Sequence, residues 1–584
     1  MLMLLIPVFT GLLGYAIGRL RNEFSFIGIV LNLYYAVRLF FRSRQDIVIY
    51  KLADVARIPV FFRLDKLSGS ILLFVAATGI LVILFSFRYM KNWKGTRGYY
   101  LYMLLVLSGA NGVLLAGNLP VMFFFWGALL VVLYGMLLIG RSGADKTACK
   151  AVVVLGLSDF VMLLGIAILV IKNGWIDLAP RVPMGLYDPM MVAAFVLIVV
   201  GALAKAGSMP LHTWIPEASR TAPATVMALI PASLCGLLGI YLLIRLSVYV
   251  FNIGSNMVLQ NVLMAIGAVT VVAAVMMALV QHRVMKILAF DMISQVGYVL
   301  IGIGTGTPIG IAGGLFCMLN NSVYGAGLFL SAGSVEYWSK SDEVDKLGGL
   351  ARQMPVTFAS FLVFALAIAG VPPLNGFFSK WMVYQGVINI GGSGNRLFPF
   401  FLVAAMLGSV LTLASFLKLT HTIFLGRGPK SLAKAREGSF TMWLPTAVLA
   451  IICIVYGVFA YQVPLPDFIY PSLPFCVEPF GIWQPVLTTL LILISLGIGA
   501  LIYLFGTARK PIEVRAFVGG EKIAESEEGR VTGAALYSSL KRLPVISWLL
   551  RLGAAGAFDL YNWLMKLLVR CRCVQDIKDD KRAG

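Results

Sequence analysis

The sequence LAKAGSMPLHTW, residues 203–214, places a lysine, a proline and a histidine at the end of a long apolar run. That run, MMVAAFVLIVVGALAKAG, covers residues 190–207 and is about the length of a helix that crosses a bilayer. A lysine inside such a helix costs several kcal/mol, and a proline interrupts helical hydrogen bonding. We therefore expect Lys205 to lie at a helix break inside a membrane, where the break at Pro210 makes its charge tolerable.

Apolar runs of this kind recur along the whole chain. The 584 residues are 60% hydrophobic and only 12% charged, about half the charged fraction of a soluble protein. We count about 15 possible membrane spans between residues 2 and 505. The first run has no basic region and no cleavage site before Arg19, so we interpret it as a membrane helix rather than a signal peptide. The sequence predicts an all-α polytopic membrane protein with about 14–16 transmembrane helices.

The charge of the chain gives its expected orientation. The formal net charge is +21, and basic residues cluster in the loops that follow odd-numbered apolar segments, as in 88–97 and 141–150. The positive-inside rule places these loops in the cytoplasm, the N-terminus outside and residues after 505 in the cytoplasm. The basic loop 42–66 departs from this pattern. We expect the lipid bilayer, and no nucleic acid, to be the partner of this charge.

The tail after residue 505 differs in composition. Residues 519–530, GGEKIAESEEGR, indicate a polar loop. Residues 558–570, FDLYNWLMKLLVR, carry a polar stripe at helical spacing, which favours an amphipathic helix along the membrane surface or against partner helices. The alternative is a sixteenth spanning helix.

Two short stretches indicate an internal repeat. AKAGSMPL (204–211) and AIAGVPPL (367–374) share five of eight residues and lie five apolar segments apart. Because five is odd, the two copies would face opposite ways across the membrane. Inverted repeats with helices broken by proline and glycine are typical of transporters. The alternative is chance, since these residue types are common in membrane helices.

Several ionisable residues lie inside apolar segments, where such residues are functional candidates. Lys205 and Lys380 lie in the segments that carry the repeat, and we infer a translocation role for both. A movable carboxylate can load or unload a buried lysine, so we pair Lys205 with Asp159. Arg245, Lys286 and Lys418 lie near segment ends, where they either function or extend to the membrane surface. Asp291 is a further candidate or an ordinary interfacial acid, and His421 is the last candidate.

Two polar residues follow the break after Lys205. His212 either relays protons or caps the broken helix end, and the sequence leaves both readings open. Glu217 lies three residues before Arg220, which predicts an interfacial ion pair.

The sequence lacks the common motifs of redox and nucleotide chemistry. It has no GxxxxGK[ST] phosphate loop, no HExxH motif and no cysteine cluster, and it contains only three histidines. We therefore expect no cofactor and no metal site, and we place any redox chemistry on other subunits.

The motifs together resemble the antiporter-like subunits of the complex I superfamily. They are KAGSMPLHTWIPEA, TAPATVMALIPAS, ALVQHRVMKILAFDMISQVGYVLIGIG, DKLGGLARQMP and AGVPPLNGFFSKW. The superfamily includes the large proton-pumping subunits of respiratory complex I, the Mrp antiporter subunits and the membrane arms of energy-converting hydrogenases. The resemblance runs from about residue 62 to residue 425. It implies two inverted five-helix repeats, each with a broken helix, and a location in the cell membrane of a prokaryote.

This resemblance implies five regions. They are N-terminal helices in 1–98, a first five-helix repeat in 99–250, a second, inverted repeat in 251–427, C-terminal helices in 428–505 and a cytoplasmic loop with an amphipathic helix in 506–584.

The resemblance also implies a line of ion-translocating residues. The matching positions are Lys205, Lys380, Asp159, His212 and Lys286, to which we add Asp291 from the residue pattern. The chain departs from the family at five polar positions. The usual glutamate is Gly127, the usual histidine of the eighth segment is Pro231 and a lysine after it is Leu237, while a histidine and a lysine four apart are Asn321 and Gly325.

We expect a membrane-arm subunit of a multi-subunit, redox-driven ion pump that moves protons, or sodium, while peripheral subunits carry out the redox reaction. The stretches NGFFSKWMVYQ (375–385) and VGGE (518–521) resemble the hydrogenase-type members more than quinone-reducing complex I. Two alternatives remain. The chain is a degenerate copy with a mainly structural role, or it is an Mrp-type cation/proton antiporter subunit.

Overall fold

A computed structural model describes residues 1–478 and 485–505, apart from 56–57, 175–176, 180–181, 426–427, 430–431 and 433, with a few positions between 536 and 562. The predicted loop at 519–530 lies outside the described residues. So does the predicted helix at 558–570, except for Asp559, Tyr561 and Asn562.

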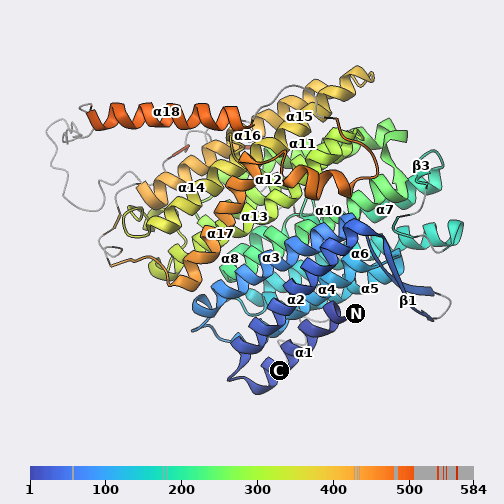
Figure 1. The fold of residues 1–584 in the computed structure, drawn as a ribbon, viewed down its shortest axis with the longest axis horizontal. Coiled ribbons are helices and arrows are strands. Elements are labelled where there is room, and N and C mark those ends of the chain that lie inside the picture. Colours follow the sequence, from blue (N-terminus) through green and yellow to red (C-terminus); the bar gives the residue numbers. More distant parts are fainter. Residues whose placement is uncertain are drawn as a thin grey trace.

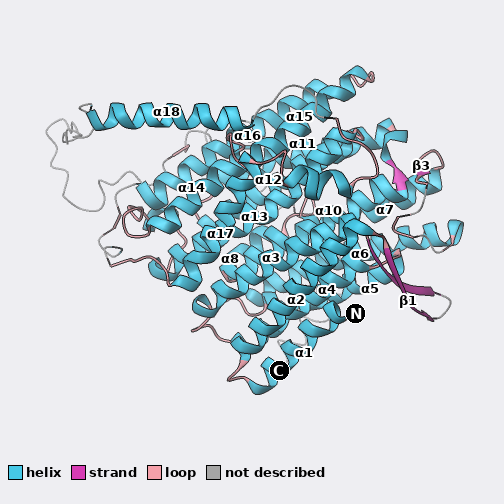
Figure 2. Ribbon diagram, in the orientation of Figure 1, coloured by secondary structure: helices cyan, strands magenta, loops and turns pink. Residues whose placement is uncertain are grey.

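The described chain is almost entirely helical (Figure 2). Twelve of its helical segments are long and apolar enough to cross a membrane, and α1, α14 and part of α18 are shorter apolar helices. The N-terminal half contains α1 Leu2–Ile17, α2 Arg21–Gln45, α3 Lys66–Tyr89, α4 Thr96–Leu115, α5 Leu119–Leu137, α6 Ala144–Asn173, α7 Pro189–Ala206, α8 Trp214–Thr221, α9 Ala224–Leu229 and α10 Gly236–Ile244. The other half contains α11 Met257–Leu279, α12 Val284–Gly304, α13 Pro308–Ser339, α14 Pro355–Ala369, α15 Asn375–Gly392, α16 Phe398–Thr420, α17 Phe440–Val458 and α18 Pro485–Phe505.

The core of the bundle lies around α12 and α13. Both helices, and the span Ala224–Val250 that contains α9 and α10, are buried along their whole apolar stretch. In Figure 1, the blue α1 and α2 and the yellow-to-orange α14 to α17 lie on opposite sides of these helices. Because α12 and α13 do not face lipid, their polar side chains can be used inside the protein.

Two small sheets interrupt the helical pattern. β1 (Val48–Val55) and β2 (Ile58–Leu64) form an antiparallel hairpin in the basic segment that departs from the charge pattern. Its β-branched and aromatic residues favour strands, and Asn118 at the start of α5 donates to the Pro59 carbonyl at 2.6 Å. A second, parallel pair joins β3 (Met184–Gly185) to β4 (Phe251–Asn252). The expectation of helices throughout did not include these strands.

The repeat motifs form two helix breaks with the same local geometry. Gly207 ends α7 and Gly370 ends α14, with φ angles of 85° and 82° that favour glycine. After each glycine, the next residue's N–H donates to a carbonyl five residues earlier: Ser208 N–H to Leu203 O and Val371 N–H to Leu366 O, both at 3.0 Å. This is the Schellman helix end, and each following loop holds one cis X-Pro bond. The chain resumes as α8 after the first break and as α15 after the second.

The C-terminal helix α18 has mostly exposed side chains. Figure 1 shows it in orange, extending beyond the bundle. Leu493 is 63% exposed and Phe505 is 87% exposed. The fifteenth predicted span corresponds to α18, which has 21 residues, but only its stretch Thr489–Gly499 is recognised as an apolar helix, and α18 is not among the twelve candidate spans.

Candidate functional site

Lys205 is buried in the last turn of α7 and lies against Trp126 of α5. Its Nζ atom lies 3.9 Å from the centre of the indole ring and donates to the Trp126 carbonyl oxygen at 3.1 Å. Only 2% of the lysine is exposed, so it does not extend to the membrane surface. A cation over an aromatic face and against a carbonyl oxygen keeps part of the stabilisation that water would provide.

Asp159 of α6 is linked to the same tryptophan. The indole Nε1 donates to Asp159 Oδ1 at 2.8 Å, whereas Oδ2 is buried and accepts no hydrogen bond. The two residues that the sequence paired therefore share one site, with Trp126 between them and no ion pair within 4 Å. A buried carboxylate oxygen without a partner is costly, which indicates a site built for a proton, a cation or water.

Gly127 does not leave a gap at this site. A Cβ atom added there would have no atom within 4 Å, whereas the side chain of the preceding Trp126 is fully buried. A side chain at position 127 would therefore project away from the packed protein. Trp126 and Asp159 provide the polar contacts of Lys205 instead.

Lys380 forms a second site of similar design on α15. Its Nζ atom lies 4.3 Å from the centre of the Tyr298 ring and donates to the Ile368 carbonyl oxygen at 2.8 Å. Ile368 lies in the last turn of α14, so Lys380 satisfies an open carbonyl of the broken helix. The two lysines lie on different sides of their breaks: Lys205 precedes Gly207, whereas Lys380 follows Gly370.

A polar network that the sequence analysis did not single out surrounds Lys380. Asn320 Oδ1, on α13, accepts a hydrogen bond from the Asn375 side-chain amide at 2.8 Å. The Asn320 amide nitrogen donates to the Asn375 backbone carbonyl at 3.0 Å and to Ser379 Oγ at 3.2 Å. Tyr298 donates to the Ala405 carbonyl at 2.8 Å. These contacts hold the start of α15 and the ring beneath Lys380 in place. The two adjacent asparagines in the apolar run of α13 were the available signal.

Asp291 of α12 provides the carboxylate of the second site. It is fully buried, Ser415 Oγ donates to its Oδ2 at 3.0 Å and its Oδ1 has no hydrogen-bond partner. Its charge interacts with both Lys380 and Lys418. Each broken-helix lysine thus has a buried carboxylate nearby with one unpartnered oxygen.

Lys418 of α16 is a third buried lysine. It is 2% exposed and donates to the carbonyls of Leu279, at 2.7 Å, and Gln281, at 3.2 Å. These carbonyls end α11, so Lys418 lies between Asp291 and the loop before α12. Lys418 is therefore not exposed at the protein surface, and its ammonium group is directed toward the end of α11.

The region between the two sites holds neutral polar groups instead of the family's charges. Pro231 lies in a π-helical turn, Ile230–Cys235, and Leu237 is buried. A Cβ atom on Gly325 would lie 2.7 Å from the Met292 sulfur, so Met292 fills the space that a lysine would need. Around them, four buried polar residues lack a partner for one atom: Thr225, Ser294, Gln295 and Asn321.

His212 and Lys286 lie apart from the two lysine sites. His212 is buried in the loop after α7, its Nδ1 atom has no partner, and its ring lies 6.3 Å from that of Phe290. Lys286 is half-buried in the first turn of α12 and interacts with Glu217. The predicted Glu217–Arg220 pair is formed, at 3.3 Å. Lys286 is thus linked to α8 through Glu217.

The sequence analysis missed two ion pairs that each involve a buried carboxylate. Arg245 is 2% exposed and contacts Asp65, which precedes α3, at 2.6 Å, so the alternative that it extends to the surface is wrong. Burial alone would raise the pKa of Asp65, but Arg245, the Ser68 amide and Arg63 hold it below its ordinary value. Arg245 and Asp65 are 180 residues apart, so the sequence pattern does not reveal that they are in contact.

The second pair lies at the end of α13. Glu336 is buried, forms an ion pair with Arg141 and accepts a hydrogen bond from Tyr89 at 2.9 Å. It joins α13 to α3 and to the loop before α6. We found no group of three or more His, Cys, Asp or Glu side chains able to hold a metal ion within the described ranges.

Comparison with known proteins places this architecture in a family. The family model described as NADH:quinone oxidoreductase/Mrp antiporter, TM, matches residues 116–412, about half of the chain. The Na(+)/H(+) antiporter subunit A1 of Staphylococcus haemolyticus is 28% identical over 461 residues, 74% of this chain and 57% of that subunit. The NADH-quinone oxidoreductase subunit N of Desulforudis audaxviator is 27% identical over 418 residues, 68% of this chain and 82% of that subunit. The chain thus spans little more than half the length of subunit A1.

Solved structures show the same fold. A chain of the membrane-bound sulfane sulfur reductase (MBS), an archaeal respiratory membrane complex, matches with a TM-score of 0.84 and 24% identity, covering 98% of this chain and 94% of that one. A chain of the Mrp complex from Dietzia sp. matches with a TM-score of 0.72 and 23% identity, covering 81% and 95%. Together with the family match, these findings show that the chain belongs to the NADH:quinone oxidoreductase/Mrp antiporter family of polytopic membrane proteins.

Proposed function

We propose that this chain moves protons, or sodium ions, across the membrane as an antiporter-like subunit of a larger complex. The observation that carries the proposal is the pair of buried lysine sites. At each one a lysine lies over an aromatic ring, donates to a backbone carbonyl and has a carboxylate with an unpartnered oxygen nearby. Such groups are expensive to bury, and in membrane proteins they mark ion pathways.

The proposed step is an exchange of partners by the lysine. When Lys205 contacts the Trp126 carbonyl, the free oxygen of Asp159 is available for a proton or a cation. A shift of a few Å toward Asp159 would replace that ligand with the ammonium group. Lys380 would work in the same way against Asp291, whose other oxygen is held by Ser415.

The route between the sites would depend on water. The buried atoms without partners on Ser294, Gln295 and Asn321 lie on α12 and α13, the two fully buried helices. A buried water needs two to four polar partners, and these side chains can supply them. Lys418 would then connect Asp291 to the surface loop at Gln281, while His212 and Lys286 would serve the Lys205 site.

The relatives support the proposed ion and the proposed partners. One relative is named a Na(+)/H(+) antiporter subunit and another an NADH-quinone oxidoreductase subunit, and both matched structures belong to membrane complexes. We therefore propose membrane-arm partner subunits, with any redox reaction on peripheral subunits. The matching Schellman ends support two inverted repeats. The basic loops support an N-terminus outside and a C-terminal tail in the cytoplasm of a prokaryotic cell.

The test is ion flux through the complex purified by a tag on this chain. In proteoliposomes, an imposed pH or sodium gradient would drive flux, followed by a pH-sensitive dye and by radioactive sodium. Lys205→Met and Lys380→Met should each lower flux at least ten-fold while all subunits co-purify. Lys172→Met, which removes a surface lysine paired with Asp188, is the control. The dye and the tracer identify the ion.

A structural role is the second candidate. Gly325, packed against Met292, and the buried Pro231 and Leu237 remove charges from the middle of the route. If the chain only holds the complex together, Lys205→Met and Lys380→Met will leave ion flux unchanged in an intact complex. That result would reject the transport proposal.

A further inference from the structure

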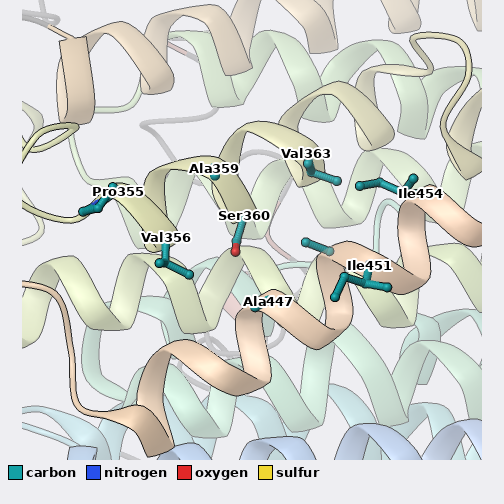
Figure 3. A pocket seen from close by; sticks show the side chains of 9 residues that line it. Pro355, Val356, Ala359, Ser360, Val363, Ala447, Ile451 and Ile454 are labelled. Atoms are coloured by element: carbon teal, nitrogen blue, oxygen red, sulfur yellow. The ribbon is translucent and has the colours of Figure 1, made fainter.

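An apolar groove separates two helices that both begin at the same side of the bundle. α14 supplies Val356, Ala359 and Val363, and α17 supplies Ala447, Ile451 and Ile454. Figure 3 shows these side chains facing each other across the groove, with the Ser360 hydroxyl between them. The groove has a volume of about 380 Å³, and Ile451 and Ile454 in its wall are exposed, so the groove would contact the lipid phase.

The mouth of the groove is held by a partly buried contact. Glu437, in the loop before α17, accepts hydrogen bonds from the amides of Val356 and Thr357 at 2.8 and 3.2 Å, and from Thr357 Oγ1 at 2.5 Å. It therefore caps α14 from another segment and fixes the loop that contains it at the groove mouth.

Three exposed cations lie in the segments that meet at this mouth. Arg352 is three residues before Pro355, and Lys434 and Arg436 lie just before Glu437. None of the three forms an ion pair within the part of the chain that the structure describes. With Glu437 already engaged at the helix end, the mouth is positively charged.

Aromatic residues mark the depth of the mouth in the membrane. Phe440 and Trp443, in the first turn of α17, contact each other edge to face with ring centres 5.2 Å apart, and Phe440 is 60% exposed. Tryptophan side chains such as that of Trp443 are enriched where lipid headgroups meet the hydrocarbon core. The cations therefore lie at headgroup level and the groove extends into the hydrocarbon.

We infer that this groove binds an anionic phospholipid. One acyl chain lies between α14 and α17, and the phosphate group lies among Arg352, Lys434 and Arg436. The proposal is independent of ion transport. The basic loops place the mouth on the cytoplasmic side, where each lysine or arginine near the surface adds to the attraction for anionic lipid.

The charge at the mouth favours a lipid over a helix of a partner subunit. A partner helix would fill the apolar walls but would leave three cations without anionic partners. A phospholipid matches both parts of the site, since its tail is apolar and its phosphate is negative. The small side chains of Ala359 and Ala447 leave room for a slim chain.

The test measures lipid binding to the intact complex by native mass spectrometry, with phosphatidylglycerol and phosphatidylcholine titrated separately. Arg352→Gln/Lys434→Gln/Arg436→Gln should weaken phosphatidylglycerol binding about ten-fold or more and leave phosphatidylcholine binding unchanged. The control replaces three exposed cations of another basic loop. Lys91→Gln/Lys94→Gln/Arg97→Gln should change the binding of neither phosphatidylglycerol nor phosphatidylcholine. Ala447→Phe fills the groove and should weaken both lipids, whereas Val403→Phe on the exposed face of α16 should not.

Three results would overturn the inference. The first is equal loss of phosphatidylglycerol binding in the two triple variants, which would indicate general surface attraction. The second is that glycerol phosphate, which has no acyl chain, competes for the site as effectively as phosphatidylglycerol. This result would mean that the apolar groove does not contribute to binding. The third is capture of a protein subunit, in place of phospholipid, by a photo-cross-linker at position 447.

Discussion

Lys205 and Asp159 do not touch, because Trp126 lies between them and binds both. The lysine donates to the tryptophan carbonyl at 3.1 Å, and the indole donates to the carboxylate at 2.8 Å. The aromatic residue thus sets the separation of the two charges. If the lysine moves toward the carboxylate during transport, the indole hydrogen bond must be in place to present the carboxylate.

Trp126→Phe tests this arrangement. Phenylalanine keeps the ring face and the backbone carbonyl beneath Lys205 but removes the indole donor, which leaves both oxygens of Asp159 unpartnered. We expect ion flux to fall several-fold and the free energy of unfolding to fall by about 1–3 kcal/mol. Flux in proteoliposomes and denaturant unfolding are the measurements.

The control for this change is Trp214→Phe. Trp214 also has a buried indole, which donates to the Ala204 carbonyl at 3.2 Å, but it contacts no carboxylate. The Trp214→Phe variant should lose stability without a comparable loss of ion flux. Flux that is equal in wild type and Trp126→Phe would show that the indole bond does not position Asp159.

The glycine at the second helix break offers a test of Lys380. An alanine at Gly370 would have to adopt a φ angle of 82°, which costs about 1–2 kcal/mol, and its Cβ atom would lie 3.0 Å from the Lys380 Cδ atom. Gly143 has a similar φ angle of 86°, but a Cβ atom added there would have no other atom within 4 Å. We expect Gly370→Ala and Gly143→Ala to lose similar stability by thermal unfolding, and only Gly370→Ala to lose flux. Equal flux in Gly370→Ala and Gly143→Ala would mean that Gly370 is not needed for the function of Lys380.

The packing at Gly325 explains why the family lysine cannot simply be restored. Its Cβ would lie 2.7 Å from the Met292 sulfur and 3.3 Å from the Ala232 Cβ. We expect Gly325→Lys to reduce the yield of folded complex, because overpacking a core costs about 1–3 kcal/mol. Met292→Ala/Gly325→Lys should recover yield by making room. Size-exclusion chromatography of the purified complex measures both, and no recovery in the double variant would mean that Met292 is not the obstacle.

The ion pair between Asp65 and Arg245 should make stability depend on pH. The pKa of Asp65 is lowered in the folded protein, so its contribution is complete above the unfolded value of about 3.9 and is lost as pH falls through the lower folded value. Asp65→Asn keeps a helix cap but leaves Arg245 unpaired, which costs about 3–5 kcal/mol. The difference in unfolding free energy between wild type and Asp65→Asn should be constant near neutral pH and should become smaller below about pH 4.

Asp54→Asn is the matched control. Asp54 forms an exposed pair with Lys51 at 3.3 Å, which is worth about 1 kcal/mol at most. The buried ion pair would be contradicted if wild type exceeded Asp65→Asn in unfolding free energy by only about 1 kcal/mol. It would also be contradicted if this difference grew as the pH falls.

Local patterns in the sequence predicted the parts of the fold that local physics controls. The apolar run before Lys205 and the glycine and proline after it are enough to predict a helix that ends inside the membrane. The same residues in the second copy predicted the break before Lys380. The hairpin at 48–64 was not predicted, because its alternating residues were read as part of a basic loop.

Contacts between distant segments could not be predicted in the same way. Trp126 and Asp159 are 33 residues apart, and Arg245 and Asp65 are 180 apart. Arg245 and Lys418 lie near helix ends, where long cations often reach the surface. Only the packing of neighbouring segments, which the sequence pattern does not contain, shows that both are buried.

The most direct test of the account is the number of ions moved per turnover of the intact complex, measured with its driving reaction in the same proteoliposomes. We predict that Lys205→Met and Lys380→Met lower this ratio while the subunit composition stays that of wild type. An unchanged ratio in both variants, in a complete complex, would contradict ion translocation by this chain and leave it a structural role.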